Sequence, residues 1–329
     1  MNMELLMDIL SGYGPSGHEG RVAAMIEKAL SGHVDSLTTD VMGNLIAVKK
    51  GDGTGKRVMF AAHMDHIGLA VIDADKHGFL RVANVGGIRA PRMVSGHVVF
   101  ENGVRGVVFA DETVKGEIQV SDLYIDIGAQ TKEEALSMVA IGDMCVMQPR
   151  VTKLGENRMA SPAMDDRIAC FVLCEAMLSL PESIKNDVYA VFTVQEEVGL
   201  RGATTAVHQV KPDMGIAIDV TGTGDVPKVK TKIAVSLGEG AAVKIMDRSM
   251  ISTPAVVAKM EALAQEKGIR VQREVLPYGG TDGGAMQQHG AGVAAGAVSI
   301  PCRYIHSEAE TVDLRDVRAA IDLVAALAE

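Results

Sequence analysis

The sequence predicts an α/β protein with a mixed, mostly parallel sheet flanked by helices, and with a small β-barrel domain inserted into it. Helical segments alternate with apolar strands across residues 160–329, the order typical of a sheet covered on both faces. Short β-type runs separated by Gly and Asn turns fill residues 69–159 instead. We therefore expect a discontinuous catalytic domain, residues 1–68 and 160–329, that carries a β-rich dimerisation or assembly domain, residues 69–159.

Composition argues against some classes of function before any motif is considered. The chain has 329 residues, of which 47% are hydrophobic and 22% charged, as in ordinary globular proteins. Its 32 basic and 42 acidic residues give a net charge of -10, and it has no Trp. These values argue against nucleic-acid binding. We expect a cytoplasmic protein without a membrane partner, because "MNMELLMDIL" lacks the basic region of a signal peptide and "GAGVAAGAVSIP" is too short to span a bilayer.

The N-terminal segment predicts two helices and then two strands. A Gly/Pro loop, "SGYGPSGHEG", separates a first amphipathic helix from a second that begins near Glu19. The strands "LIAVKK" and "RVMFAAH" follow, joined by "GDGTGK". This Gly-rich stretch lacks the GxxxxGK[ST] spacing and does not open a helix, so we interpret it as a hairpin turn and not a phosphate-binding loop.

Residues 69–159 show the pattern of a small β domain. The pair Asn102-Gly103 lies between two β-type runs, "GHVVFE" and "VRGVVFA", and is a strong hairpin signal. One helical segment, "TKEEALSMV", interrupts the strands. Four cysteines in a chain of this length do not form a secreted disulfide framework, which fits a reducing compartment.

From Arg167 onward, helices and strands alternate. A helix from Arg167 precedes the strand "DVYAVFTVQEE", and a helical stretch leads to the strand "DMGIAIDV". The helix "TPAVVAKMEALAQEKG", the strand "RVQREVLPY", a Gly-rich loop and the strand "GVAAGAVSIP" follow, and a last helix begins after Thr311. This is the pattern of βα units in a sheet with helices on both faces.

Acidic and histidine side chains recur where buried strands end, and these are costly positions for unpaired charges. In open α/β sheets, binding sites form at the carboxyl ends of the strands. Carboxylates gathered there repel one another unless a positive charge lies between them, and metal cations supply one. A His/Asp/Glu set without cysteine suits zinc, cobalt or manganese. The residues at these ends are His63, Asp65, Asp165, Asp166, Glu196, Glu197, Asp219, His306 and Glu308.

Five motifs in this order, "AAHMDHIG", "SPAMDDR", "FTVQEEVGLRGA", "AIDV" and "YIHSEAETV", resemble those of the TET-type aminopeptidases, the glutamyl aminopeptidase or "cellulase M" dinuclear metallopeptidases. The resemblance covers the whole chain and implies a zinc-exopeptidase-like fold with a PDZ-like inserted domain. One position departs from the pattern, because His66 stands where that family commonly has Glu. We leave His66 outside the site.

The resemblance implies a ligand set for two divalent ions per subunit, Zn²⁺ or Co²⁺ foremost, with Mn²⁺ as a third candidate. His63 and Asp219 would hold one ion, Glu197 and His306 the other, and Asp165 would bridge both. Only a carboxylate can bind two cations at a separation of roughly 3.5–4 Å. The resemblance also implies a cis peptide between Asp165 and Asp166.

Two further acids receive catalytic roles. Asp65 shares a strand face with His63, so its carboxylate can accept the proton of the other imidazole nitrogen. Glu196 is expected to act as general base, taking a proton from a metal-activated water and returning it to the leaving amine. The loop "LPYGGTDGGAM" resembles the substrate-side loop of the family. Asp282 is either a substrate contact or a residue of a Gly-rich turn without a ligand role.

The expected activity is removal of N-terminal residues from peptides with a free N-terminus. Alternatives are a carboxypeptidase or N-acyl-amino-acid deacylase of related two-metal fold, a glycoside hydrolase (endoglucanase) and a non-catalytic binding protein. A glycosidase would leave both histidines unexplained, and the deacylases generally recognise a substrate carboxylate with Arg or His from a different type of insertion. The resemblance further implies self-association into a homododecamer built from dimers. Side-chain preference and the physiological metal stay open.

Overall fold

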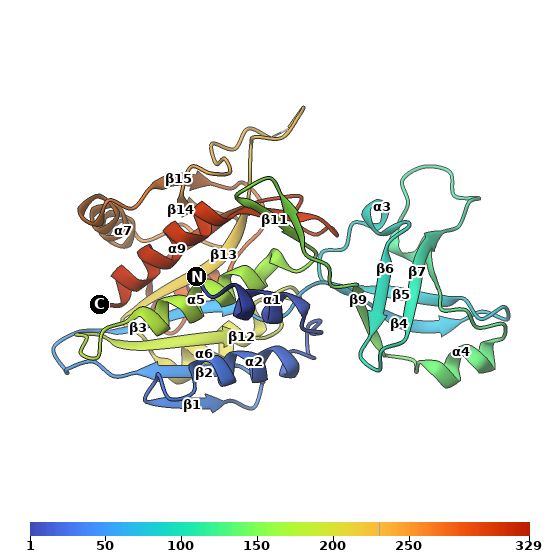
Figure 1. The fold of residues 1–329 in the computed structure, drawn as a ribbon, viewed down its shortest axis with the longest axis horizontal. Coiled ribbons are helices and arrows are strands. Elements are labelled where there is room, and N and C mark those ends of the chain that lie inside the picture. Colours follow the sequence, from blue (N-terminus) through green and yellow to red (C-terminus); the bar gives the residue numbers. More distant parts are fainter. Residues whose placement is uncertain (230) are drawn as a thin grey trace.

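The computed structural model describes residues 1–229 and 231–329, which form two lobes (Figure 1). Within these residues an 11-stranded mixed sheet dominates the larger lobe. Its central strands β12, β3, β13 and β16 are parallel, and antiparallel strands lie at both margins. The strands in spatial order are β1 (Ser36–Thr39), β2 (Leu45–Lys49), β12 (Asp187–Thr193), β3 (Arg57–His63), β13 (Met214–Gly222), β16 (Ala294–Arg303), β17 (Glu310–Asp313), β11 (Arg158–Ser161) and β10 (Thr152–Leu154), with β14 (Ala241–Met246) pairing β16, and β15 (Val271–Val275) pairing β14.

Apolar side chains on both faces of the central strands bury the sheet under two layers of helices. In β3, Val58 and Phe60 belong to one hydrophobic core and Met59 and Ala61 to the other, because alternate side chains of a strand point to opposite faces. The first core is covered by α1 (Met3–Ser11), α2 (Gly20–Leu30), α5 (Met164–Ser179), α7 (Pro254–Lys267) and α9 (Leu314–Ala328); the second is covered by α6 (Arg201–Val210) and α8 (Asp282–Gln287). The predicted α/β class is confirmed.

Helix α5 lies at the centre of the first core and is apolar nearly all round, as expected of a helix enclosed by neighbours. Its Arg167 is fully buried and donates hydrogen bonds to the carbonyl oxygens of Ile9, Gly12, Gly14 and Met64. Gly14 lets the chain pass this guanidinium, since a Cβ there would lie 2.8 Å from Nη2 of Arg167. The arginine therefore ties the C-terminal end of α1 to the segment that follows β3.

The smaller lobe is a closed antiparallel barrel with its own hydrophobic core. Its strands in spatial order are β4 (Gly68–Ala74), β5 (Leu80–Val85), β8 (Leu123–Asp126), β7 (Arg105–Ala110), β6 (His97–Phe100) and β9 (Met144–Met147), accompanied by α3 (Ala90–Met93), the 3-10 turn Val120–Asp122 and α4 (Lys132–Met138). The hairpin predicted at Asn102-Gly103 joins β6 to β7, with Gly103 at a φ of 89°. Strands β10 and β11, which fall within or at the end of the predicted insertion 69–159, pair with the large sheet.

The hairpin predicted at "GDGTGK" is wrong. Strands β2 and β3 do not pair, because β12 lies between them, antiparallel to β2 and parallel to β3. The Gly-rich loop instead docks on the segment before β12, where the amides of Asp52 and Gly55 donate to the carbonyl oxygens of Ile184 and Lys185. A strand from far along the chain thus occupies the place that a hairpin partner would take.

Among the described residues, every helix is too short or too polar to cross a lipid bilayer.

Candidate metal centre and active site

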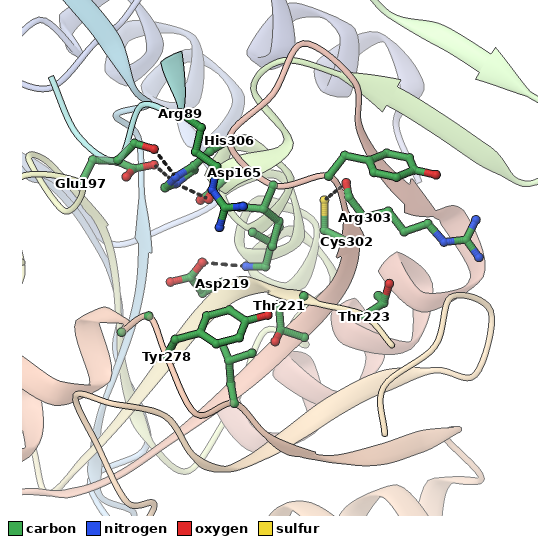
Figure 2. Close-up of a pocket in the computed structure, with 18 of the residues that line it drawn as sticks. Arg89, Asp165, Glu197, Asp219, Thr221, Thr223, Tyr278, Cys302, Arg303 and His306 are labelled. Carbon is green, nitrogen blue, oxygen red and sulfur yellow. Dashed lines mark hydrogen bonds and ion pairs between the residues drawn. The ribbon is translucent and has the colours of Figure 1, made fainter. Parts of the chain in front are cut away.

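A cavity of about 590 Å³ opens where the central strands of the sheet end, on the side that faces the barrel. The large sheet, the loop after β12 and the turn before α3 all contribute to its wall (Figure 2). Six of the residues expected in the site line it together: His63, Asp165, Glu196, Glu197, Asp219 and His306. Residues that are up to 243 positions apart in the sequence therefore meet at one point.

One group of donor atoms lies at the end of β3. Ligand atoms of His63, Asp165, Asp166 and Asp219 lie within 4.8 Å of one another, as the ligands of a single cation must. Nε2 of His63 is 3.2 Å from Oδ1 of Asp165. All four side chains are buried, so their charges are poorly screened by water.

A second group shares one member with the first. Asp165, Glu197 and His306 also present ligand atoms within 4.8 Å of one another. Nε2 of His306 lies 3.4 Å from Oδ2 of Asp165 and 3.2 Å from Oε1 of Glu197, as the dashed lines of Figure 2 show. Asp165 therefore turns one oxygen toward each histidine.

Both imidazole rings are held through their other nitrogen. Nδ1 of His63 lies 3.0 Å from the backbone carbonyl oxygen of Asp65 and 3.5 Å from its carboxylate. Nδ1 of His306 lies 2.9 Å from the carbonyl oxygen of Gly87 in the barrel lobe. A carbonyl can only accept, so Nδ1 carries the proton in each ring and Nε2 is free to bind a cation. The backbone of Asp65, more than its carboxylate, performs the orienting role expected of that residue.

The carboxylate of Asp65 instead holds the loop that follows β12. It accepts hydrogen bonds from the amides of Glu196 (2.9 Å) and Glu197 (3.2 Å), and from the hydroxyl of Ser16 (2.6 Å). The preceding amides are held in the same way, Gln195 by the carboxylate of Glu19 (3.1 Å) and Val194 by Oδ1 of Asn44 (3.0 Å). Side chains from distant segments thus fix four consecutive amides, and adjacent Glu196 and Glu197 both reach the cavity.

The site is electrostatically unbalanced without a cation. Burial, reinforced by the neighbouring carboxylates, raises the pKa of Glu196 and of Asp219 well above the ordinary range. Burial alone would lower the pKa of His306, but Asp165 and Glu197 outweigh it and raise that pKa to about 11. When positive charge is lacking, neighbouring carboxylates repel one another and tend to stay protonated. A histidine beside them tends to keep its proton, because its positive charge offsets theirs. The nitrogen and oxygen donor set fits divalent transition ions.

The structure adds residues that the sequence pattern did not single out as ligands or supports. Asp166, which was named among the strand-end acids but given no ligand role, joins the first donor group, and the cis peptide expected between Asp165 and Asp166 is present. Glu310 holds both ligand segments, accepting from the amides of Asp165 (2.9 Å) and His306 (2.7 Å). The double Asp of "AMDDR" could have signalled Asp166, and Glu310 lies within the motif "YIHSEAETV", which was interpreted for His306 alone.

Two residues considered for this region lie outside the cavity wall. Asp282 is buried at the start of α8, where its carboxylate accepts from the Thr193 hydroxyl (2.6 Å). His66 is buried near Arg167, and burial together with that positive charge lowers its pKa to about 3. Both effects favour the neutral form of the His66 ring.

A parallel-centred α/β sheet that gathers His, Asp and Glu donors around a cavity at its strand ends is an arrangement that could hold metal ions for hydrolytic chemistry. Residues 43–323 match the model of the M42 glutamyl aminopeptidase family. The chain therefore belongs to the M42 family and is a peptide hydrolase.

Individual relatives match this chain over nearly its full length. The lysyl aminopeptidase of Pyrococcus furiosus is 37% identical, with 100% of this chain and 97% of that protein covered. The structure of aminopeptidase APDkam598 from the archaeon Desulfurococcus kamchatkensis superposes with a TM-score of 0.95 at 39% identity, covering 99% of this chain and 94% of that one. The TET1 peptidase of Pyrococcus horikoshii, which can assemble into a tetrahedron or a large octahedral shell, gives a TM-score of 0.89 at 35% identity, covering 99% and 98%.

Proposed function

We propose that this protein is an aminopeptidase that removes N-terminal residues from peptides at a centre of two divalent metal ions, Zn²⁺ or Co²⁺ foremost. The single observation that carries the proposal is the pair of donor groups that share Asp165. His63 and Asp219 would hold one ion and Glu197 and His306 the other, while Asp165 would serve both. Asp166 belongs to the same donor group as His63 and Asp219, and one of its carboxylate oxygens accepts from the His63 amide, so it would support the ligands of the first ion.

Two such ions, when bound, lower the pKa of a shared water and polarise the scissile carbonyl. The protein's own contribution is to hold their ligands in place before substrate arrives. The rings of His63 and His306 are fixed through Nδ1, and Glu310 fixes the backbone beside Asp165 and His306. Ligands held by such outer hydrogen bonds bind metal more tightly and with a defined geometry.

Glu196 is proposed as the general base. Its carboxylate lies 3.8 Å from Nε2 of His63, beside the metal ligands, yet it belongs to neither donor group. It is therefore free to take the proton of the attacking water and to return it to the leaving amine. Asp65 acts as a positioning residue for this step, because it holds the amides of Glu196 and Glu197.

The acidic character of the site suits the free α-amino group of a peptide. Carboxylates at one end of the cavity attract an ammonium group and favour cleavage next to it. This charge distribution favours an exopeptidase that acts at N-termini over a glycosidase, which would need only two carboxyl groups and neither histidine.

Metal removal and reconstitution test the proposal. Treatment with a chelator should abolish hydrolysis of aminoacyl p-nitroanilides, and Zn²⁺ or Co²⁺ should restore it. Glu196→Gln should bind the same metal content with an unchanged fold and lose about 10²–10⁴-fold in kcat, the usual contribution of a general base. Unchanged turnover in Glu196→Gln would refute the base assignment, and full activity in metal-free protein would refute the metal centre.

We further propose that residues 69–159 serve assembly and that the chain forms a homododecamer built from dimers in the cytoplasm. The shells formed by the TET1 peptidase of Pyrococcus horikoshii support the assembly. The four cysteines, all within the described residues, are buried free thiols, which suits a reducing compartment.

A further inference from the structure

The His306 loop, residues 304–309 between β16 and β17, has an unfavourable backbone conformation. Tyr304 and His306 have φ values of 62° and 61°, in the left-handed region that residues with a Cβ rarely adopt. Such a conformation persists only where the surrounding contacts hold it. Because His306 is a proposed ligand of the second ion, the one expected between Glu197 and His306, the contacts that hold this loop also hold that ligand.

The large lobe supplies part of this support. Glu310 accepts a hydrogen bond from the His306 amide at 2.7 Å. The hydroxyl of Ser307 donates to the carbonyl oxygen of Tyr304 at 2.6 Å. These contacts act on the His306 amide and on the first turn of the loop, whereas the imidazole ring is held from elsewhere.

Two hydrogen bonds attach the loop to the barrel lobe on either side of His306. Arg92 in α3 donates to the carbonyl oxygen of Ile305 at 2.6 Å. On the other side, the carboxylate of Glu308 accepts from the amide of His97, the first residue of β6, at 3.1 Å. Helix α3 lies at the edge of the barrel that faces the large lobe (Figure 1). The barrel therefore holds both the residue before His306 and a residue two positions after it.

The barrel also approaches the side chains of both outer ligands of the second ion. Nδ1 of His306 donates to the carbonyl oxygen of Gly87 at 2.9 Å, and a Cβ on Gly87 would lie 2.7 Å from Cε1 of that ring. A Cβ on Gly86 would lie 3.1 Å from Cβ of Glu197. Figure 2 shows Glu197 and His306 turned toward one another beside Asp165. Glycines permit this close approach because they carry no side chain.

The outer ligands of the first ion, His63 and Asp219, are held within the large lobe. Nδ1 of His63 lies 3.0 Å from the carbonyl oxygen of Asp65. The carboxylate of Asp219 accepts from the amide of Val220 at 2.7 Å. The two metal positions therefore differ in their support, because the ligands of the second ion contact both lobes.

We propose that Arg92 and Glu308 are positioning residues for His306, so that the affinity of the second ion, and not that of the first, depends on the contact between the barrel and the His306 loop. This inference rests on the two-metal centre of the proposed function and assigns further residues to it. Both side chains are exposed and belong to neither donor group, so they act through the loop backbone. Hydrogen bonds outside the ligands themselves change metal affinity by about 10–100-fold.

The variants remove these two hydrogen bonds at exposed positions. R92M keeps an apolar stem without a donor, and E308A removes the acceptor. The conservative variant R92K/E308Q keeps a donor and an acceptor at the same positions. R21M is the matched control, because Arg21 of α2 also donates to a carbonyl oxygen of the other lobe, that of Glu101 at 3.1 Å, but outside the His306 loop.

Calorimetric titration of the metal-free chain with Co²⁺ gives a Kd for each position, and the visible absorption of bound Co²⁺ reports its ligand geometry. Crystals grown with one equivalent of Co²⁺ identify the position that fills first. We expect R92M/E308A to raise the Kd of the second ion by about tenfold or more, and that of the first by less than about twofold. R92K/E308Q should recover part of the loss, and R21M should keep both values.

A merely structural role would weaken both positions together and would not be rescued by the conservative variant. Wild-type Kd values at both positions in R92M/E308A would overturn the inference. An equal rise at both positions, or the same loss in R21M, would overturn it as well.

Hydrogen exchange of the metal-free chain tests the contact apart from the metal. Amides of residues 304–309 should exchange about tenfold faster in R92M/E308A than in the wild type or R21M, and unchanged exchange would overturn the inference. Selective loss of the second ion in a protein that does not hydrolyse aminoacyl p-nitroanilides would support the inference and refute the aminopeptidase. Hydrolysis combined with wild-type Kd values in R92M/E308A would do the reverse.

Discussion

Asp165 is the residue on which the whole site converges. Each of its two oxygens faces a different histidine, His63 at 3.2 Å and His306 at 3.4 Å. Its amide donates to Glu310, so the backbone that carries this carboxylate is itself fixed. A carboxylate can bind one cation through each of its oxygens, so in the proposed centre Asp165 would serve both ions.

Removing Asp165 should therefore affect both metal positions, whereas removing an outer ligand should affect one. We expect Asp165→Ala to weaken binding of both ions by roughly 100-fold or more, and Asp219→Ala and His306→Ala to weaken mainly one each. Metal content after equilibrium dialysis at graded Zn²⁺ concentrations measures this. Two ions per chain at wild-type affinity in Asp165→Ala would contradict the bridging role.

Residues at strand ends were the most predictable part of the site. His63, Glu196, Glu197 and His306 all follow apolar strands, and strand direction alone brings such positions to one edge of a sheet. Arg92 and Glu310 gave no such signal, because their roles depend on how the barrel and β17 sit against the sheet. The period of the strand places the Asp65 side chain on the same face as His63. It does not predict whether the backbone carbonyl or the carboxylate of Asp65 accepts the hydrogen bond from the His63 ring.

At the scale of elements, the site depends on how firmly α5 is attached to its surroundings. The helix begins at Asp165, a proposed metal ligand, and Arg167, two residues later, binds carbonyl groups from α1, the loop after it and the segment that follows β3. All the hydrogen bonds that Arg167 donates go to carbonyl groups, while the nearby carboxylates of Asp65 and Glu19 favour its charge from a distance. Its stabilising effect comes from pairing carbonyl oxygens that would otherwise be buried without a donor.

Arg167→Met tests this attachment. The substitution keeps the side-chain volume but leaves several buried carbonyl groups without a hydrogen-bond donor. We therefore expect the free energy of unfolding to fall by about 3–5 kcal/mol. Arg318→Met on the exposed face of α9, where the arginine pairs with Asp322 four residues on, should change it by less than about 1 kcal/mol. Urea unfolding at a fixed protein concentration measures both. Equal losses in the two variants would show that the carbonyl network is unimportant.

Helices and local hairpins could be predicted from the sequence because their signals are local. The Asn102-Gly103 turn and the helix at α4, whose N-cap is Thr131, both appear where the residues place them. The pairing of β2 and β3 was mispredicted because it is decided elsewhere. Strand β12, more than a hundred residues later, occupies the position between them, and no pattern in "GDGTGK" reports that.

At the scale of the whole molecule, the two lobes share the cavity. The larger lobe supplies every proposed metal ligand, from strand ends, loops and the start of α5, while the barrel supplies the carbonyl that orients His306 and the arginines of the opposite wall. An inserted domain that also mediated assembly would couple oligomer formation to the shape of the active site.

The proposed assembly is tested by size. Light scattering coupled to size-exclusion chromatography should give a particle of twelve chains, with dimers as the smaller species on dilution. A monomer at all concentrations would contradict the assembly proposal without affecting the metal centre.

Acids and imidazoles that are far apart in the sequence are proposed to close around two cations. Anomalous diffraction at the zinc edge, from crystals of the protein supplied with excess Zn²⁺, tests it directly. Two peaks roughly 3.5–4 Å apart are predicted, one beside His63 and Asp219 and the other beside Glu197 and His306, with Asp165 between them. No peak in the cavity, or a single peak that leaves either histidine without a metal, would contradict the account.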